Sequence, residues 1–483
     1  MMDILKDLRH IVGERHVLVA HDQTVGFSTD VTGKWVGQVR AVVRPANTSE
    51  VAAVMRLAYE TGTPVIPQGG NTGLTGATCA DAKDNAILLS LARLNTIRDI
   101  RPDSRTAIVE AGVVLETLHR AVAQHGLIYP MTFGAKGSCT IGGNMGTNAG
   151  GSNVLRYGNT RDLVLGIEAV LPDGEIVDLM SELHKDNTGY NLKHLLIGAE
   201  GTLGIITAAV VKLKPQPRAY FTAMVAVPDI PTSLVLLNRL QEDSGNAVEA
   251  FEYMPAYYFN LLCARFPETR LPFGTNVEHG IFLEVGLSRG DDVTPDENGA
   301  LPGVARLESL LMELLEAGDI DDAVVCKSEA QRGEMWQRRE RAYESTVAHG
   351  VSVDCDISLA LDGVDGFLKS MDVALAEIAP GAETMAVAHL GDGNLHYSIW
   401  PMPGSDAPIP DPLYTEIMEQ VENTVLGLRG SFSAEHGIGL MKLPSMERRK
   451  DKGALRMMWA IKAALDPKNI MNPGKVLPPL ATQ

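Results

Sequence analysis

The sequence lacks several features that would fix its class at once. No apolar run reaches the roughly 18 residues that a membrane-spanning helix needs. The five cysteines are scattered and form no C-x-x-C pair, so they predict free thiols in a reducing compartment. Two nucleotide-binding fingerprints are also missing: no Lys-Ser/Thr pair follows the glycine clusters, and no G-x-G-x-x-G follows a predicted strand. A P-loop and a Rossmann site are therefore not expected.

Positive charge is also in short supply. The chain has 42 Lys and Arg against 60 Asp and Glu, a net charge of −18, which argues against nucleic acid or an anionic membrane as a partner. An anionic substrate then needs local cations. The start of the chain, MMDILKDLRHIVGERH, mixes charges into helical apolar spacing and resembles neither a secretory signal nor a transit peptide. A cytoplasmic location without a transmembrane segment is the simplest expectation.

Glycine is concentrated in two stretches. Residues 134–158 read GAKGSCTIGGNMGTNAGGSNVLRYG, where main chain can approach a ligand closely and short side chains add donors and acceptors. Residues 64–77, PVIPQGGNTGLTGA, run from an apolar strand into a glycine cluster suited to a pyrophosphate. The first stretch alone also fits a glycine-rich surface loop. Together the two favour a phosphate-bearing cofactor.

The length of 483 residues predicts two or three domains. Strands are expected at 41–44, 64–66, 86–91, 106–109, 164–171, 175–178 and 207–213, with helices at 4–12, from the Asn47 cap, at 115–124 and at 191–197. Pro215 and Pro217 mark a domain boundary. We therefore divide the chain into a lead-in (1–36), a cofactor domain (37–217), a substrate domain (218–412) and a C-terminal helical segment (413–483).

The substrate domain alternates strands at 222–227 and 280–285 with helices at 232–241 and 304–316. This pattern predicts a sheet with helices on one face, built from paired ferredoxin-like units. The C-terminal segment is expected to be helical over 414–428, 445–465 and 467–480.

Two histidines flank a turn in residues 385–400, MAVAHLGDGNLHYSIW. A tight hairpin around Gly391-Asp392-Gly393 brings His389 and His396 together across the strands. Two imidazoles bind a divalent metal only if a third ligand joins them, and on their own they are more often structural. Residues 431–439, SFSAEHGIG, contain Glu435, a carboxylate that supplies such a ligand.

These motifs, with IGAEGTLGIIT at 197–207, resemble the FAD-binding domain of the vanillyl-alcohol oxidase superfamily. The best match is the branch of D-2-hydroxyglutarate and D-lactate dehydrogenases, and it runs from Phe27 to Pro478. The resemblance implies an α+β fold: an FAD-binding domain of two subdomains, a ferredoxin-like substrate domain, and a helical segment returning to the flavin. It also implies FAD-dependent oxidation of a D-2-hydroxy acid. Because nothing marks a nicotinamide site, we expect an electron-accepting protein or a quinone as the electron acceptor.

The resemblance also implies which residues bind FAD. Tethered relatives often carry a histidine in the pyrophosphate loop, where this chain has Asn71, so we expect non-covalent FAD with Cys139 as a small neighbour. The implied cofactor residues are Pro67, Gln68, Gly69, Gly70, Asn71, Thr72, Gly73, Leu74, Gly134, Ser138, Cys139, Gly142, Gly143, Asn144, Thr147, Asn148, Gly150, Gly151, Glu200, Gly201, Ile206 and Asn472.

The family motifs H-L-G-D-G-N-L-H and S-A-E-H-G imply a metal site of His389, His396 and Glu435. Zinc suits such ligands with an open position, and manganese, iron or cobalt also fit. The metal would hold a 2-hydroxy acid and lower the pKa of its hydroxyl. His436 corresponds to the family's base, which takes the hydroxyl proton.

Substrate contacts are implied around residues 335–344, MWQRRERAYE. Arginines clustered in this way usually lie on a solvated helix face, but the resemblance implies that Arg339 anchors a carboxylate. The 2-hydroxyglutarate enzymes carry Thr, Lys and Asn where this chain has Tyr343, Asp354 and Ser398.

The substitution at Asp354 favours a substrate with a neutral or hydroxylated tail, or with an amine, unless Asp354 points away or pairs with an arginine of 338–341. D-Lactate or glycolate specificity is one alternative. A flavin-binding subunit without turnover of its own is another, from a different class. A homodimer is compatible with the sequence, which does not fix the oligomeric state.

Overall fold

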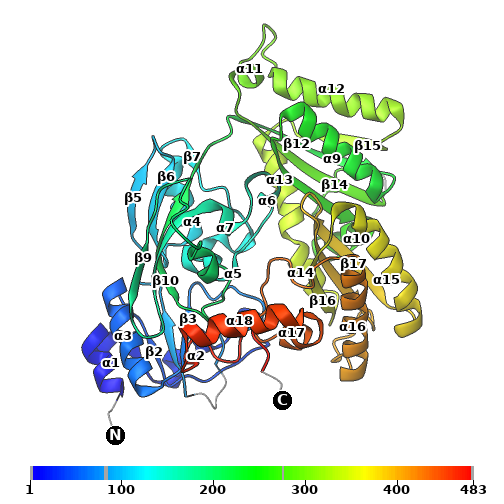
Figure 1. The fold of residues 1–483 in the computed structure, drawn as a ribbon. Helices are drawn as coiled ribbons and strands as arrows, with labels where there is room; N and C mark the ends of the chain where they lie inside the picture. Colours follow the sequence, from blue (N-terminus) through cyan, green and yellow to red (C-terminus); the bar gives the residue numbers. More distant parts are fainter. Residues whose placement is uncertain (1–3, 81–84, 275–276, 480–483) are drawn as a thin grey trace. The chain divides into compact units, whose positions relative to one another are not determined.

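The computed structural model describes residues 4–80, 85–274 and 277–479. The chain divides into two compact units (Figure 1). The first takes residues 1–150, 158–215 and 435–483, and the second takes residues 151–157 and 216–434. The second unit therefore includes a short piece from the middle of the glycine-rich stretch. No helix in the described ranges has the length and apolar character to cross a membrane.

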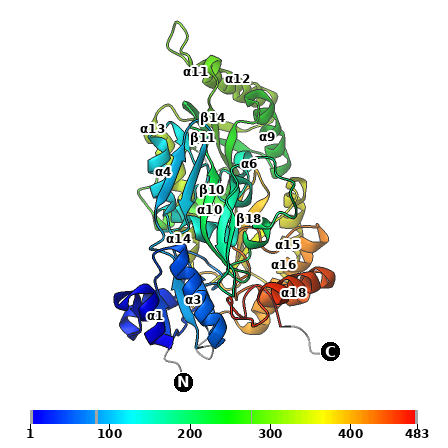
Figure 2. The same ribbon diagram turned by 60° about the vertical axis from the view of Figure 1, so that its left-hand side comes forward.

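The first sheet of the first unit has the strand order β1-β2-β4-β3. Its strands are β1 (Val17–Leu18), β2 (Ala41–Val43), β3 (Val65–Gln68) and β4 (Ile87–Ser90), and β2, β4 and β3 run parallel. Helix α3 (Thr48–Thr61) begins where the Asn47 side chain accepts from the N–H of Glu50, as its capping signal predicts. Its apolar face joins the buried strands and α1 (Ile4–Val12), which lies beside α3 (Figure 2).

The second sheet of this unit is antiparallel, with the order β5-β6-β10-β8-β9. It consists of β5 (Ile97–Arg101), β6 (Thr106–Glu110), β8 (Val164–Val170), β9 (Ile176–Leu179) and β10 (Ile205–Lys212). Helix α4 (Leu115–Ala123) follows β6, and β8 and β9 form the hairpin predicted at Asp173-Gly174. Part of the glycine-rich stretch, expected as exposed backbone, forms helix α5 (Ile141–Thr147).

The second unit contains a seven-stranded antiparallel sheet of order β15-β12-β14-β13-β17-β18-β16. A complete ferredoxin-like repeat is formed by β12 (Ala219–Val227), α9 (Ile230–Ser244), β13 (Val248–Pro255), β14 (His279–Leu287), α12 (Pro302–Ala317) and β15 (Asp322–Val325). A second repeat is formed by β16 (Val353–Ser358), α15 (Val364–Ile378), β17 (Glu383–His389), β18 (Asn394–Trp400) and α16 (Asp411–Gly427), without a fourth named strand among the described residues. The repeats join where β13 pairs with β17.

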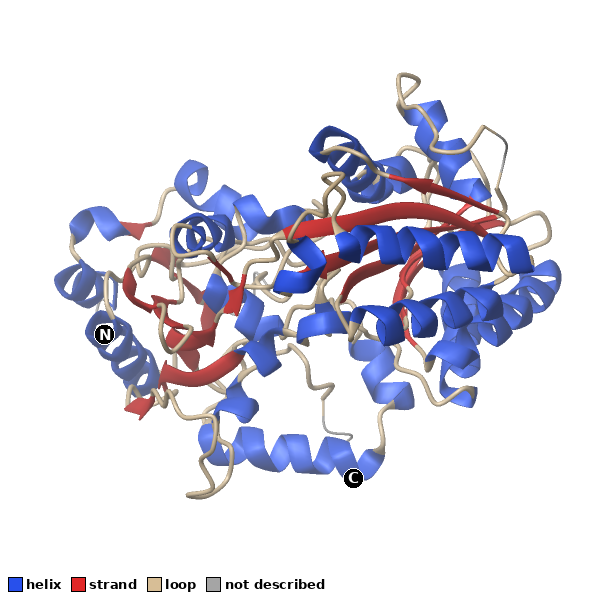
Figure 3. Ribbon diagram, turned by 90° about the horizontal axis from the view of Figure 1, so that it is seen from above, coloured by secondary structure: helices blue, strands red, loops and turns tan. Residues whose placement is uncertain are grey.

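Helices cover both faces of this sheet, whereas the sequence predicted one (Figure 3). The four long helices α9, α12, α15 and α16 pack on one face, with Phe367 and Val421 in their core. The shorter helices α10 (Ala256–Arg265), α13 (Glu329–Glu340) and α14 (Ala342–Val347) pack on the other, around Tyr258 and Trp400. The sequence placed α16 with the C-terminal segment, but its apolar face belongs to the core of the second unit.

The C-terminal part of the first unit holds α17 (Leu443–Arg449) and α18 (Lys452–Leu465). Residues 467–479, predicted as helix, are irregular, because prolines at 467, 473, 478 and 479 interrupt helical hydrogen bonding; Leu480 lies outside the described residues. The buried Lys462 ammonium donates to the carbonyls of Thr202 and Met471 and to Asp466. These bonds fix the irregular tail against the 197–207 motif.

The piece of the glycine-rich stretch that belongs to the second unit contains α6 (Val154–Tyr157). Arg156 Nη1 donates to the buried carboxylate of Glu249 on β13 at 2.7 Å and to the carbonyl of Gly286 at 2.9 Å. The Tyr157 hydroxyl donates to the same Glu249 oxygen at 2.6 Å. Both side chains that donate to Glu249 within the described chain thus come from this short inserted helix.

Candidate active site

The first unit contains a cavity of about 410 Å³ beyond the ends of β3 and β4. Five predicted cofactor residues line it: Gln68, Gly69, Gly70, Asn71 and Ser138. The other lining residues were not predicted: Gly26, Phe27, Ser90, Ala92, Asn95, Gly112, Val114, Thr117 and Thr140. Thr140 lies within the glycine-rich stretch that carried the signal. The remaining residues come from segments that contain no motif.

The loop after β3 has the chemistry of an anion site. Within the described residues, no backbone N–H from Gly69 to Gly73 donates a hydrogen bond to the protein. Asn71 adopts left-handed backbone geometry with φ 54°, and its side chain is fixed by bonds to Thr29 and Thr78. Successive N–H groups that point into a cavity form a nest for phosphate oxygens. These residues therefore fit the pyrophosphate of a dinucleotide.

Glycine at position 70 is required by close packing. A Cβ there would lie 2.2 Å from the carbonyl oxygen of Ser138. This contact brings the two glycine-rich stretches together at the cavity. The close backbone approach expected of these glycines is thus made, at Gly70, to the other glycine-rich stretch.

Several other predicted cofactor residues make hydrogen bonds within the chain. In α5 the N–H groups of Gly142, Gly143 and Asn144 are bonded to Ala111 or Thr140, and Asn148 accepts from the N–H of Arg161. Cys139 is buried, and burial raises the pKa of its thiol to about 11. The other predicted residues outside the cavity lining are Pro67, Thr72, Gly73, Leu74, Gly134, Thr147, Gly150, Gly151, Gly201 and Ile206.

Glu200 holds the loop that follows the S-A-E-H-G motif. Its two carboxylate oxygens accept from the N–H groups of Ile438 and Gly439 at 2.7 and 2.8 Å. Burial raises the pKa of Glu200, and the two N–H bonds offset only part of that effect. Asn472 donates to the carbonyl of Glu200, while its buried Oδ1 has no hydrogen-bond partner among the described residues. Both residues therefore hold neighbouring backbone in place, and the Oδ1 atom of Asn472 can still accept a hydrogen bond.

The histidine hairpin forms as predicted, between β17 and β18. The rings of His389 and His396 lie 5.3 Å apart in an edge-to-face arrangement. Asp356 on β16 lies directly opposite His396 in the sheet. The backbone N–H of Ala434 donates to the Asp356 side chain at 3.2 Å, so the chain itself brings Glu435 to this strand.

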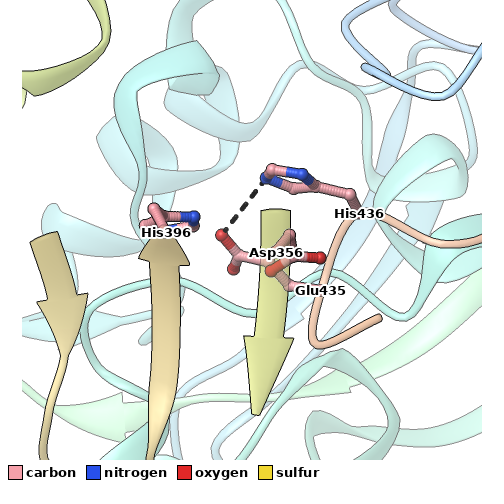
Figure 4. A group of neighbouring side chains, drawn as sticks. All are labelled: Asp356, His396, Glu435 and His436. Carbon is pink, nitrogen blue, oxygen red and sulfur yellow. Dashed lines mark ion pairs between the residues drawn. The ribbon is translucent and has the colours of Figure 1, made fainter. Parts of the chain in front are cut away.

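A cluster of four side chains results: Asp356, His396, Glu435 and His436, whose ligand atoms lie within 4.8 Å of one another (Figure 4). His436 Nε2 lies 3.8 Å from a carboxylate oxygen of Glu435. Such a set of imidazoles and carboxylates suits a divalent metal. Asp356 was not predicted, because it stands in an ordinary alternating strand, VDCDIS, and only sheet register places it there.

His389 is not one of these four residues. Its Nδ1 instead shares a hydrogen bond of 2.8 Å with Oε1 of Glu252, and the other oxygen of Glu252 accepts from Arg339 Nε at 2.6 Å. Burial alone would raise the pKa of Glu252, but His389 and Arg339 hold it below its ordinary value. Arg339 is buried and does not lie on a solvated helix face. Its Nη2 has no hydrogen-bond partner among the described residues.

The three residues that depart from the family pattern differ in their exposure to solvent. Tyr343 on α14 is 60 % exposed. Asp354 on β16 is exposed, and its carboxylate accepts from the hydroxyls of Ser352 and Ser398 at 2.8 Å each. Ser398 is buried on β18, one alternation from His396 on the same face.

Two family models match this chain, one over the region of the glycine-rich motifs and one over the region of the histidine motifs. Residues 39–180 match the FAD binding domain family, and residues 216–476 match the C-terminal domain of FAD linked oxidases. The chain belongs to the FAD-linked D-2-hydroxyacid dehydrogenases. It is 34 % identical over 470 residues to the mitochondrial D-2-hydroxyglutarate dehydrogenase of Arabidopsis thaliana, covering 97 % of this chain and 80 % of that one.

Bacterial relatives of these dehydrogenases match as well. D-2-hydroxyglutarate dehydrogenase of Stutzerimonas stutzeri is 33 % identical over 476 residues, covering 98 % of each chain. Among solved structures, p-cresol methylhydroxylase has a TM-score of 0.74 at 15 % identity, covering 99 % of this chain and 97 % of that one. The 4-ethylphenol oxidase of Gulosibacter chungangensis has a TM-score of 0.69 at 17 % identity, with the same coverage. The structural matches support the α+β fold of this flavoenzyme class.

Proposed function

We propose that this dehydrogenase oxidises a D-2-hydroxy acid to the 2-oxo acid with the help of a divalent metal and a histidine base. The observation that carries the proposal is the cluster of Asp356, His396, Glu435 and His436, which gathers metal ligands and a proton acceptor in a chain with an FAD-binding domain. Named relatives that act on D-2-hydroxyglutarate support the reaction class.

FAD, when bound, supplies the hydride acceptor. The backbone N–H groups of Gly69, Gly70 and Asn71 would hold its pyrophosphate, and Ser138 and Thr140 would line the same cavity. The buried Oδ1 of Asn472 is an unmet acceptor for a donor group of the cofactor. The Cys139 thiol stays neutral and buried, so binding is non-covalent.

We propose His389, His396 and Glu435 as the metal ligands, with zinc as the first candidate. A divalent ion there supplies Lewis acidity that lowers the pKa of the substrate hydroxyl. Asp356 keeps the ligands in register, because it accepts from Asn394 and from the N–H of Ala434, the residue before Glu435. Glu200 secures the same loop beyond His436.

His436 takes the hydroxyl proton at a ring nitrogen while the C2–H bond breaks, its hydride leaves and the C2=O bond forms. Arg339 directs its unmet Nη2 donors to a substrate carboxylate. Two electrons then have to leave the reduced cofactor. We propose an electron-accepting protein or a quinone as the acceptor, and a cytoplasmic location, consistent with cysteines that are all free.

Anaerobic addition of substrate to the purified yellow protein tests the proposal. We expect D-2-hydroxy acids to bleach the flavin absorbance, whereas their L-enantiomers leave it unchanged. A panel with carboxylate, neutral and amine tails ranks the substrates. A protein that stays yellow with every D-2-hydroxy acid would instead be a flavin-binding subunit without turnover.

A further inference from the structure

A single buried carboxylate connects two parts of the site described above. Glu252 stands on β13 directly opposite His389 on β17. Its side chain is 1 % exposed, and its two oxygens accept from different groups: Oε1 from His389 Nδ1 at 2.8 Å and Oε2 from Arg339 Nε at 2.6 Å. No motif marked this residue.

We propose that Glu252 is a positioning residue that sets the metal-binding nitrogen of His389 and the carboxylate-binding edge of Arg339 at the same time. This inference rests on the proposed function, since it assigns His389 to the metal and Arg339 to the substrate. All three residues lie in the second unit, on β13, β17 and α13.

The effect on His389 follows from the tautomer. A carboxylate accepts hydrogen bonds, so Glu252 requires the proton of the neutral imidazole to sit on Nδ1. The lone pair is then on Nε2, which is the atom that can bind a metal. A carboxylate behind a metal-bound histidine is a recurrent arrangement, and losing such a partner typically costs about 10–100-fold in metal affinity or activity.

The effect on Arg339 follows from its remaining donors. With Nε held by Glu252, the planar guanidinium has a fixed orientation, and its buried Nη2 lacks a partner among the described residues. Other arginines of α13 have their donors engaged: Arg332 pairs with Glu284 through two nitrogens, and Arg338 bonds to the carbonyl of Arg270 and to Glu334. Arg339 is thus the α13 arginine prepared for a ligand anion.

Glu252→Gln separates a positioning role from simple packing. The amide keeps the shape of the side chain, but it has one acceptor oxygen where two donors must be met. If that oxygen serves Arg339, the NH2 group donates to His389 Nδ1 and moves the ring proton to Nε2. If it serves His389, the NH2 group opposes Arg339 Nε. Either arrangement damages one of the two functions.

Glu284→Gln is the matched control. Glu284 is also buried, stands on the neighbouring strand β14, and accepts from Arg332, Thr222 and Trp336. It has no bond to His389 or Arg339 among its hydrogen bonds within the described chain. The same chemical change is therefore made in a similar environment outside the proposed site.

Three measurements on the FAD-loaded protein test the inference. Equilibrium dialysis of Zn²⁺ should show a loss of at least tenfold in affinity for Glu252→Gln if its amide oxygen serves Arg339, and a loss of less than twofold for Glu284→Gln. Binding of 2-oxoglutarate to metal-free protein, followed by the flavin spectrum, should weaken for Glu252→Gln alone if its amide oxygen serves His389. Nitrogen-15 NMR of His389 should find the proton on Nδ1 in the wild type.

Failure of this inference can be told apart from failure of the proposed function. If the wild type binds no metal, the metal assignment fails, but the NMR tautomer still decides the role of Glu252. A wild-type proton on Nε2 overturns the inference even if Glu252→Gln does not fold. So does a folded Glu252→Gln protein that binds both Zn²⁺ and 2-oxoglutarate as the wild type does.

Discussion

The hydroxyl of Ser398 donates a 2.8 Å hydrogen bond to the carboxylate of Asp354 on the neighbouring strand. Ser352 donates to the same oxygen. The sequence left open whether Asp354 pairs with an arginine of 338–341, and its hydrogen bonds within the described chain go to these two serines. An exposed carboxylate therefore lies on the sheet face that carries His396.

Asp354→Lys should change the preference among substrate tails. An ionised Asp repels a distal carboxylate, whereas Lys attracts it. We expect kcat/KM for D-2-hydroxyglutarate to rise at least tenfold in the variant, with little change for D-lactate. Asp354→Asn, which removes the charge and keeps the shape, should fall between them. A wild type that already prefers the dicarboxylate, with no gain from Lys, would sink the idea.

FAD should leave the denatured protein completely. The Cys139 thiol is buried and its raised pKa of about 11 keeps it neutral, while the pyrophosphate loop has Asn71 and no histidine. Acid precipitation followed by centrifugation should put all yellow colour in the supernatant. Colour that stays in the washed pellet would mean a covalent bond.

Metal binding and proton transfer should respond to different substitutions. His396→Ala, His389→Ala and Glu435→Gln each remove a proposed ligand, so metal affinity should fall at least tenfold. His436→Ala should retain the metal and lose flavin reduction. Metal content after dialysis and anaerobic bleaching measure the two effects. Full metal content in His389→Ala would refute its assignment as a ligand.

Glu200→Gln should alter how stability depends on pH. Because the folded-state pKa of Glu200 is raised above the ordinary 4.5, its contribution is complete below that value and is lost as the pH rises through the folded-state pKa. The wild type should therefore lose stability relative to the variant as the pH rises above the ordinary value of 4.5. Urea unfolding at several pH values measures this difference.

Glu168→Gln provides the opposite case in the same unit. Burial raises the pKa of Glu168, but bonds from Thr48, Arg98 and Thr207 bring it below its ordinary value. Its contribution is present above about pH 4.5 and is lost only as the pH falls through the lowered pKa. Its difference from the wild type should stay constant over the range in which Glu200→Gln changes.

Local signals predicted the elements that depend on neighbouring residues. The Asn47 cap, the Asp173-Gly174 turn and the alternation around Gly391 each gave the right helix or hairpin, because a cap or a turn is decided within a few residues. The helix predicted after residue 466 was wrong. The apolar residues of this tail suggested a helix, but its four prolines prevent one.

The supports of the site could not be predicted in the same way. Asp356 and Glu252 reach the histidines only through the register of β13, β16, β17 and β18, and pairing between distant strands leaves no local pattern. The motif predicts Glu200 as a cofactor residue, and only the fold shows that its carboxylate also binds the backbone beyond His436. Motifs thus identified the histidine hairpin, and the register of the sheet decided which further side chains lie beside it.

Because of the small helix α6, the regions that match the two family models, residues 39–180 and 216–476, cannot be exchanged between relatives as separate modules. A shorter chain of residues 216–434 alone would lose Arg156 and Tyr157, and the buried carboxyl group of Glu249 would be left without either partner. Leaving a buried charge unpaired typically costs about 3–5 kcal/mol. Any chimera that exchanges substrate specificity between relatives therefore needs to carry residues 151–157 with the substrate half, although they are encoded within the cofactor half.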